Sequence, residues 1–151
     1  MADDSRSIEN LLYTYAERID AGDLEGVADL FAHGQITAQA DTTTAQRFEG
    51  RDEVLGMYEA ATRLYEDNGT PHTKHVTTNA IIDVDERAGT AVARSYYTVF
   101  QQTDALPLQP IIAGRYHDTF KRIDGAWWFD TRTMFVDLVG DLSHHLLYEL
   151  R

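Results

Sequence analysis

The amino-acid sequence predicts an α+β fold in which helices come first and a long, curved, antiparallel sheet follows. Apolar residues recur with a helical period up to about residue 65. Residues 72–138 instead form four segments rich in β-branched and aromatic side chains. The chain has 151 residues, enough for one sizeable core, and contains no internal repeat or linker. We therefore expect residues 1–151 to form a single domain, with a pocket between the helices and the concave face of the sheet.

The first expected helix runs from Ser5 to Asp20. Its apolar side chains recur at positions i, i+3, i+4 and i+7, and they are Ile8, Leu11, Leu12, Tyr15 and Ile19. An acidic or hydroxyl residue can cap its start, with Asp3, Asp4 and Ser5 as candidates. The Ala21-Gly22 pair is expected to end the helix.

Two shorter helices are predicted next. Asp23 can cap a helix from Leu24 to Phe31, and Gly50 precedes a helix from about Asp52 to Tyr65. Between them lie a segment from His33 to Ala40, a polar break and a short candidate strand. The break is Asp41 to Thr44, and the strand is Gln46 to Glu49.

Four long strands follow, separated by turn signals. The expected strands are His72 to Val84, Thr90 to Gln102, Gln109 to Ile123 and Ala126 to Leu138. The expected turns are Asp85 to Gly89, the Leu106-Pro107 region and the hairpin signal Asp124-Gly125. The remaining stretch, Asp141 to Arg151, is expected to be a short helix or an arm.

Composition excludes several classes of protein. The net charge is −12, from 13 basic and 25 acidic residues, which argues against binding of nucleic acid or of an anionic membrane. No apolar run is long enough to span a bilayer, and the acidic start lacks a hydrophobic signal region, so we expect a cytoplasmic protein. The absence of cysteine excludes disulfides, thiolate metal sites and cysteine nucleophiles.

A candidate general base lies in the first long strand. Side chains alternate along a strand, so His75, Thr77 and Asn79 are expected on one face, where they could line a polar pocket. On a helical wheel, Asp20 lies about 100° from the centre of the apolar face of the first helix, at the edge of the buried surface. A carboxylate at a helix C-terminus opposes the dipole by about 0.3–1 kcal/mol, which favours a partnered role.

If the two side chains meet, they form a general base. A neutral histidine can take a proton near pH 7, and a carboxylate on its other nitrogen fixes the tautomer and stabilises the imidazolium. On the residues alone, Asp20 is instead read as solvated or as a cap of the following turn. His75 is instead read as a core histidine bonded to a carbonyl, or as exposed on an edge strand. His72 and His75 face opposite sides of a strand, so we expect no metal site.

Aromatic side chains supply further pocket candidates. Tyr15 lies on the apolar face of the first helix and is either a pocket residue or core, while Tyr13 projects close to Asp20 on the wheel. Tyr116 is a pocket candidate or a packing residue. One of Tyr96 and Tyr97 should face the cavity.

Polar candidates complete the set. Arg132 could anchor an anionic substrate through its planar fork or form a structural ion pair. Asn79 is a candidate substrate contact. The pair His144-His145 is expected at the surface or an interface. Thr37, Gln39 and Phe48 are candidates for the pocket mouth.

Several local patterns resemble the NTF2-like superfamily, and within it the SnoaL-like group. They are Asp23 to Phe31, Phe48 to Val54, Gly114 to Phe120, Asp124 to Phe129, and Arg132. The resemblance implies a cone in which N-terminal helices pack on a curved, mixed, mostly antiparallel sheet around a pocket. It also implies that Asp20 and His75 correspond to the His–Asp dyad of scytalone dehydratase, hexachlorocyclohexane dehydrochlorinase and the bile-acid 7α-dehydratases. Tyr15 matches a pocket tyrosine of the last group.

The expected function is therefore that of a cofactor-independent lyase, of the dehydratase or dehydrohalogenase type, acting on a small, fairly apolar cyclic compound. The same base would serve an isomerase or a polyketide-type cyclase. A non-catalytic ligand-binding or scaffold subunit, like the dioxygenase small subunits that share this fold, is the third alternative. We expect no cofactor, and a homo-oligomer, either a trimer or a dimer.

Overall fold

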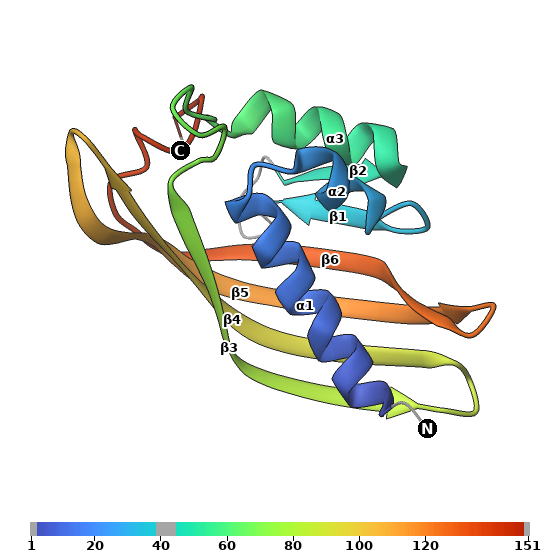
Figure 1. Ribbon diagram of the computed structural model, residues 1–151. Helices are drawn as coiled ribbons and strands as arrows, with labels where there is room; N and C mark the ends of the chain where they lie inside the picture. The colour runs from blue at the N-terminus through green and yellow to red at the C-terminus, as the bar shows by residue number, and fades with distance from the viewer. Residues whose placement is uncertain (1–2, 39–44, 150–151) are drawn as a thin grey trace.

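The computed structural model describes residues 3–38 and 45–149 (Figure 1). Three helices are followed by most of a six-stranded mixed sheet that does not close on itself, which confirms the predicted α+β class. The helices are α1 (Asp4–Asp20), α2 (Leu24–Asp29) and α3 (Gly50–Ala61). The strands are β1 (Gln35–Ala38), β2 (Gln46–Glu49), β3 (Thr73–Asp85), β4 (Thr90–Thr103), β5 (Leu106–Ile123) and β6 (Ala126–Val139).

The sheet order is β2-β1-β6-β5-β4-β3, so the four long strands form a meander and β1 adds to its β6 side. β1 runs parallel to β6, and every other neighbouring pair is antiparallel. In Figure 1, α1 lies across the long strands, whereas α2 and α3 lie beside β1 and β2. The apolar side of α1 faces the sheet, with Ile8, Leu12 and Ile19 almost fully buried.

The helix boundaries largely match the prediction. Asp3 caps α1, accepting from the backbone N–H groups of Ser5 and Arg6. Asp23 caps α2, but this helix ends at Asp29 because the following N–H groups bond three residues back, as in a 3₁₀ turn.

The third helix differs more from the prediction. It starts at Gly50 and ends at Ala61, four residues before the expected Tyr65, because Thr62 is extended and forms a β-bridge with Leu146. The partner of this bridge belongs to the stretch after β6, which is an arm with a turn at residues 143–145, not a helix. The N–H of Arg63 donates to the carbonyl of His145, and that of Leu147 to Ala61, each at 2.9 Å. The arm is thereby held along the end of α3.

Two strand predictions need correction. The β4–β5 turn is Asp104-Ala105, and Leu106 and Pro107 belong to β5. In β3, a bulge lies between Thr78 and Ile81, with Asn79 in the left-handed region at φ 56°. His75 and Thr77 are partly buried before the bulge, whereas Ala80 and Ile82 take that position after it. The expected shared face is therefore wrong for Asn79, which is exposed.

Part of the prediction lies outside the described residues, namely Gln39 and the polar break Asp41 to Thr44. Among the helices of the described ranges, none is both long and apolar enough to cross a membrane.

Candidate active site

Asp20 and His75 meet where the end of α1 lies against the start of β3. His75 Nδ1 lies 2.7 Å from Asp20 Oδ1, and the backbone N–H of His75 donates to Asp20 Oδ2 at 2.8 Å. The hydroxyl of Thr73 donates to Oδ1, also at 2.8 Å. With Asp20 ionised, Nδ1 carries the proton of a neutral His75, and the lone pair lies on Nε2.

The environment of Asp20 favours its charged form. Burial alone would raise the pKa of this carboxyl, but the hydrogen bonds and charge of His75, together with the Thr73 hydroxyl, outweigh burial and lower it. The side chains of Asp20 and His75 are only 10% and 9% exposed. Asp20 is thus a fixed carboxylate that orients and stabilises the imidazole.

His75 lines a small cavity of about 140 Å³ between the helices and the sheet, which we call the inner cavity. Five tyrosines line it as well: Tyr15, Tyr58, Tyr97, Tyr116 and Tyr148. Apolar side chains make up much of the rest: Ile19, Val99, Ile112, Met134, Val136, Leu142 and Leu146. A cavity of roughly 150 Å³ can hold a benzene-sized ring.

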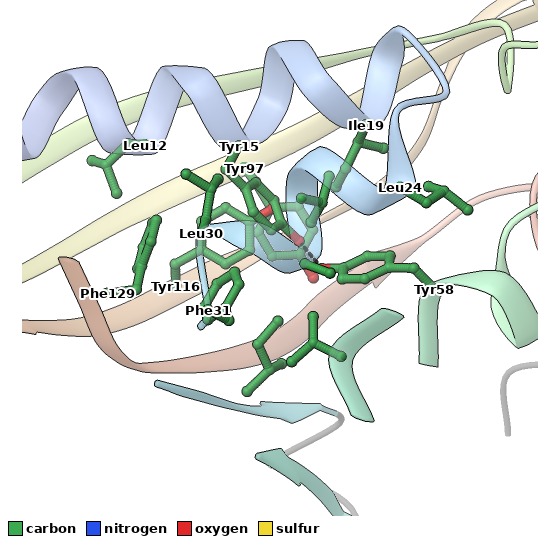
Figure 2. Packing of buried hydrophobic residues seen from close by; sticks show 14 of the residues in the cluster. Leu12, Tyr15, Ile19, Leu24, Leu30, Phe31, Tyr58, Tyr97, Tyr116 and Phe129 are labelled. Atoms are coloured by element: carbon green, nitrogen blue, oxygen red, sulfur yellow. Dashed lines mark hydrogen bonds between the residues drawn. The ribbon is translucent and has the colours of Figure 1, made fainter. Parts of the chain in front are cut away.

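The tyrosine hydroxyls form two separate arrangements. Those of Tyr15 and Tyr58 are hydrogen-bonded to each other, and Figure 2 shows them meeting between α1 and α3. Tyr15 also reaches the sulfur of Met134 at 3.7 Å, a weak acceptor. Burial raises the pKa of Tyr58 well above its ordinary value, so this phenol stays protonated and is a hydrogen-bond donor, not a base.

Tyr97, not the exposed Tyr96, faces the cavity. Its hydroxyl donates to the carbonyl of Phe135 at 2.8 Å, crossing over Gly114. A Cβ at Gly114 would lie 2.6 Å from that hydroxyl and 1.9 Å from the Phe135 oxygen, so only glycine allows this arrangement.

Tyr116 is buried beneath the cavity, stacked on Tyr97 at 4.4 Å between ring centroids. The guanidinium of Arg132 lies 3.7 Å from the Tyr116 centroid and 4.2 Å from that of Tyr15. Arg132 makes two hydrogen bonds to Asp118, at 2.8 and 2.9 Å, and both side chains are fully buried. Of the two roles expected for Arg132, the structure contains the ion pair.

Two other candidates lie away from the inner cavity. Tyr13 is 45% exposed and borders a separate hollow of about 430 Å³, together with Asp20 and His75. Asn79 lines none of the three hollows described in this section. The structure therefore brings His75, Tyr15 and Tyr116, but neither Tyr13 nor Asn79, to the inner cavity. Asp20 does not line this cavity and is joined to it through its hydrogen bond to His75.

Sequence reasoning missed a second histidine in the cavity wall. The structure corrects the expected surface position of His145, which is only 8% exposed and lies edge-on to His75, with 6.2 Å between ring centroids. Its position depends on the pairing of the arm with the end of α3, which no local pattern indicates. Tyr58, a buried residue of α3, was missed too.

A wider groove of about 960 Å³ adjoins the inner cavity, and we call it the outer groove. The two share Tyr58, Thr62, Met134, His145 and Leu146 among their lining residues. Phe48, a predicted mouth residue, lines the groove, whereas Thr37 lines neither space. Within residues 3–38 and 45–149, no three His, Asp or Glu side chains converge in a way that could hold a metal ion.

Solved structures with the same fold come from several bacteria. A Nostoc punctiforme protein of unknown function with a cystatin-like fold is 23% identical, with a TM-score of 0.74 over 94% of this chain and 97% of that one. A "Putative Scytalone Dehydratase" of Novosphingobium aromaticivorans is 24% identical, with a TM-score of 0.72 over 98% and 89%. The "beta subunit of a putative aromatic-ring-hydroxylating dioxygenase" of the same organism is 19% identical, with a TM-score of 0.68 over 89% of each chain.

These identities are low, so the likenesses establish the NTF2-like, cystatin-like fold alone. No curated protein sequence matches the chain. The model of the SnoaL-like domain family matches residues 1–133, which include α1, β3 and most of the sheet. The chain therefore belongs to the SnoaL-like domain family of the NTF2-like superfamily.

Proposed function

We propose that this protein is a cofactor-independent lyase of the dehydratase type, with His75 as general base and Asp20 as the carboxylate that orients it. The observation that carries the proposal is the 2.7 Å contact between Asp20 Oδ1 and His75 Nδ1 at the wall of a cavity. This contact leaves the lone pair of Nε2 for a substrate. General-base catalysis of this kind contributes typically ~10²–10⁴ in rate.

The reaction that suits this site is the elimination of water from a β-hydroxy carbonyl compound. His75 Nε2 takes the C–H proton next to the carbonyl, and the imidazolium is stabilised by Asp20. A C=C bond forms as the C–O bond breaks, and the proton on Nε2 passes to the departing hydroxide. Water leaves, and His75 is neutral again.

The tyrosine pair supports the same chemistry. The hydroxyls of Tyr15 and Tyr58 are joined by one hydrogen bond, which uses the O–H of one tyrosine and leaves the other O–H free to donate elsewhere. In the structure, Tyr15 donates this second O–H to the sulfur of Met134, a weak acceptor. A substrate carbonyl is a stronger acceptor, and a donor aimed at it stabilises the negative charge that develops on oxygen. Tyr15 therefore serves as an electrophilic contact, and Tyr58 supports it.

The two hollows suggest how a substrate is held. The inner cavity accepts one ring, and the outer groove is large enough for an apolar extension of that ring. Phe48, Met57 and Leu146 line the groove and supply apolar contacts. A cyclic compound with an apolar substituent fits both spaces better than a single small ring.

The test uses two probes that yield the same product. Dehydration of 3-hydroxycyclohexanone gives cyclohex-2-enone and water, whereas cyclohex-3-enone gives the same enone by isomerisation. Alkyl-substituted forms of both probes should also be supplied, to fill the outer groove. A lyase turns over the hydroxyketones, and we expect Asp20→Asn and His75→Gln each to reduce that rate by about 10²–10⁴.

Tyr13→Phe is the matched control, since Tyr13 lies close to Asp20 but outside the inner cavity. Its turnover should equal that of the unmodified chain. Enone formation that survives both dyad substitutions, in variants that unfold at the same urea concentration as the unmodified protein, would overturn the proposed base.

An isomerase is the second candidate, because the same base can return its proton to another carbon. Preferential turnover of the cyclohex-3-enones over the hydroxyketones would favour it. A scaffold subunit is the third alternative. The presence of an inner cavity beside the dyad argues against it, since a pure scaffold needs no such space.

We also propose a homo-oligomer formed through the open face of the sheet. Val76, Ile81, Val92 and Tyr96 project from this face of β3 and β4 and are each at least 39% exposed. Light scattering after size exclusion distinguishes dimer from trimer, and a monomer at micromolar concentration would contradict the proposal.

A further inference from the structure

His145 is a buried polar residue that the proposed reaction does not yet use. It comes from the arm after β6, and its side chain lines both the inner cavity and the outer groove. The backbone of His145 is held at both ends, by a bond from its N–H to the Leu142 carbonyl and by one from Arg63 N–H to its own carbonyl. The ring is thus placed by the fold and not by a side-chain partner.

One nitrogen of the His145 ring lacks a hydrogen-bond partner among the described residues. This nitrogen, Nδ1, is buried. A buried polar atom left unsatisfied costs about 1–3 kcal/mol, so such an atom beside a cavity needs a water or a ligand. Most other polar side chains around the inner cavity have partners: His75 bonds Asp20, Tyr15 bonds Tyr58, and Tyr97 bonds the Phe135 carbonyl.

His145 is also suited to a neutral contact. Burial is the main cause that lowers its pKa to about 4, and the nearby His75 lowers it further, although Asp20 opposes the shift. At neutral pH the imidazole therefore has one donor and one acceptor nitrogen and bears no charge. Such a group pairs well with a hydroxyl or carbonyl oxygen, and poorly with a carbon-bound halogen.

We propose that His145 binds an oxygen atom of the substrate, opposite the base His75, and that it selects oxygen-bearing rings over hydrocarbon or halogenated rings of the same shape. The inference deepens the proposed lyase, since it favours a dehydratase over a dehydrohalogenase. It rests on that proposal only in taking the inner cavity as the substrate site.

The test compares phenol with toluene, two rings of similar size that differ in one hydroxyl group. Binding is measured at pH 7 by ligand-observed NMR to the unmodified protein and to two variants, His145→Leu and His145→Asn. Leucine and asparagine have nearly the same shape, but only asparagine keeps polar atoms at the ring's first branch. We expect phenol affinity to fall roughly 3- to 10-fold in the leucine variant relative to the asparagine variant, and toluene affinity to change little.

A second measurement needs no variant. In the unmodified protein, the imidazole nitrogen shifts of His145 should move on addition of phenol and stay unchanged with toluene. Equal phenol affinity of the two variants together with unmoved shifts would overturn the proposal, and so would a lack of saturable phenol binding. A bound water that phenol does not displace in a crystal structure would also overturn it.

The two proposals fail separately. Loss of the phenol preference, with Asp20→Asn still strongly reducing turnover, would refute the role of His145 and leave the lyase intact. A clear phenol preference with no effect of Asp20→Asn on turnover would refute the dyad and leave an oxygen-binding cavity.

Discussion

Two aspartates, Asp118 and Asp20, each pair with a basic side chain of the sheet at a similar distance but in different surroundings. Asp118 and Arg132 lie opposite each other on β5 and β6, joined at 2.8 and 2.9 Å, with no exposed side-chain surface. Asp20 and His75 join α1 to β3 at 2.7 Å, and His75 lines the inner cavity. The first carboxylate is paired on both oxygens with one permanent cation, and the second with a group that can gain or lose a proton.

The difference separates a structural pair from a chemical one. A guanidinium does not deprotonate in proteins, so Arg132 can hold charge in the core but cannot exchange a proton. An imidazole changes charge near neutral pH, and a carboxylate behind it favours the charged state. The contribution of each pair should therefore be visible in a different measurement.

The largest expected effect is on stability, from removal of Arg132. Arg132→Leu leaves the charge of Asp118 buried without a partner, and should lower the free energy of unfolding by about 3–5 kcal/mol, as measured by urea denaturation. The double variant Asp118→Leu/Arg132→Leu should recover much of that loss. A single variant as stable as the unmodified protein would show that the pair is not structural.

Breaking the other pair should spare stability and affect turnover. Asp20→Asn keeps acceptor and donor atoms near Thr73 and His75, so we expect less than about 2 kcal/mol loss of unfolding free energy, but a rate lower by about 10²–10⁴. Steady-state assays with the hydroxyketones give the rate of enone formation, and urea denaturation gives the free energy of unfolding. If Asp20→Asn lost much stability but turned over the substrate as fast as the unmodified protein, the Asp20–His75 pair would be structural and our assignment would be wrong.

Acid should reveal the Asp20 pair in a third way. Because folding lowers the pKa of Asp20, its stabilisation is complete above the unfolded value of about 3.9 and is lost as pH falls through the folded pKa. The difference in unfolding free energy between the unmodified protein and Asp20→Asn should thus shrink as pH falls from about 5 to about 2.5. Other carboxylates with lowered pKa, such as Asp67 and Asp137, are common to both proteins and cancel in the comparison. A difference that stays constant or grows would contradict the assignment.

The smallest effect concerns the bulge that separates the dyad end of β3 from its packing end. Asn79 is at φ 56°, where glycine is unstrained and alanine is not, so Asn79→Ala should destabilise by about 1 kcal/mol and Asn79→Gly by less. Neither change should alter turnover, because the side chain is exposed. Loss of activity in Asn79→Gly without loss of stability would restore Asn79 as a substrate contact.

Local sequence patterns predicted most helices and strands of the fold, and the position of each dyad residue on its own element. The apolar period of α1 places Asp20 at the edge of the buried surface, and strand alternation places His75 on a polar face. That the two side chains meet was implied only by the resemblance to the dyad enzymes. The Asp118–Arg132 pairing could have been counted from the Asp124-Gly125 hairpin, but a bulge between Thr119 and Phe120 shifts the register by one. Bulges are weakly encoded, although an asparagine such as Asn79 adopts the left-handed region more readily than most residues.

His145 could not be predicted in the same way. Its burial depends on contacts between the arm and the end of α3, more than 80 residues earlier in the chain. Two adjacent histidines in a polar segment look like surface residues until that pairing is known. The same holds for the meeting of Tyr15 and Tyr58, which come from helices that no local signal relates.

The arm also orders events during synthesis. Asp20 and His75 leave the ribosome long before residues 142–148, and a domain generally folds as a unit. A nascent chain that has completed β6 thus already contains both members of the dyad, yet one wall of the cavity is missing until the arm pairs with Thr62. The imidazole of His75 would stay open to water during this interval, so a competent site is expected to be among the last parts of the molecule to form.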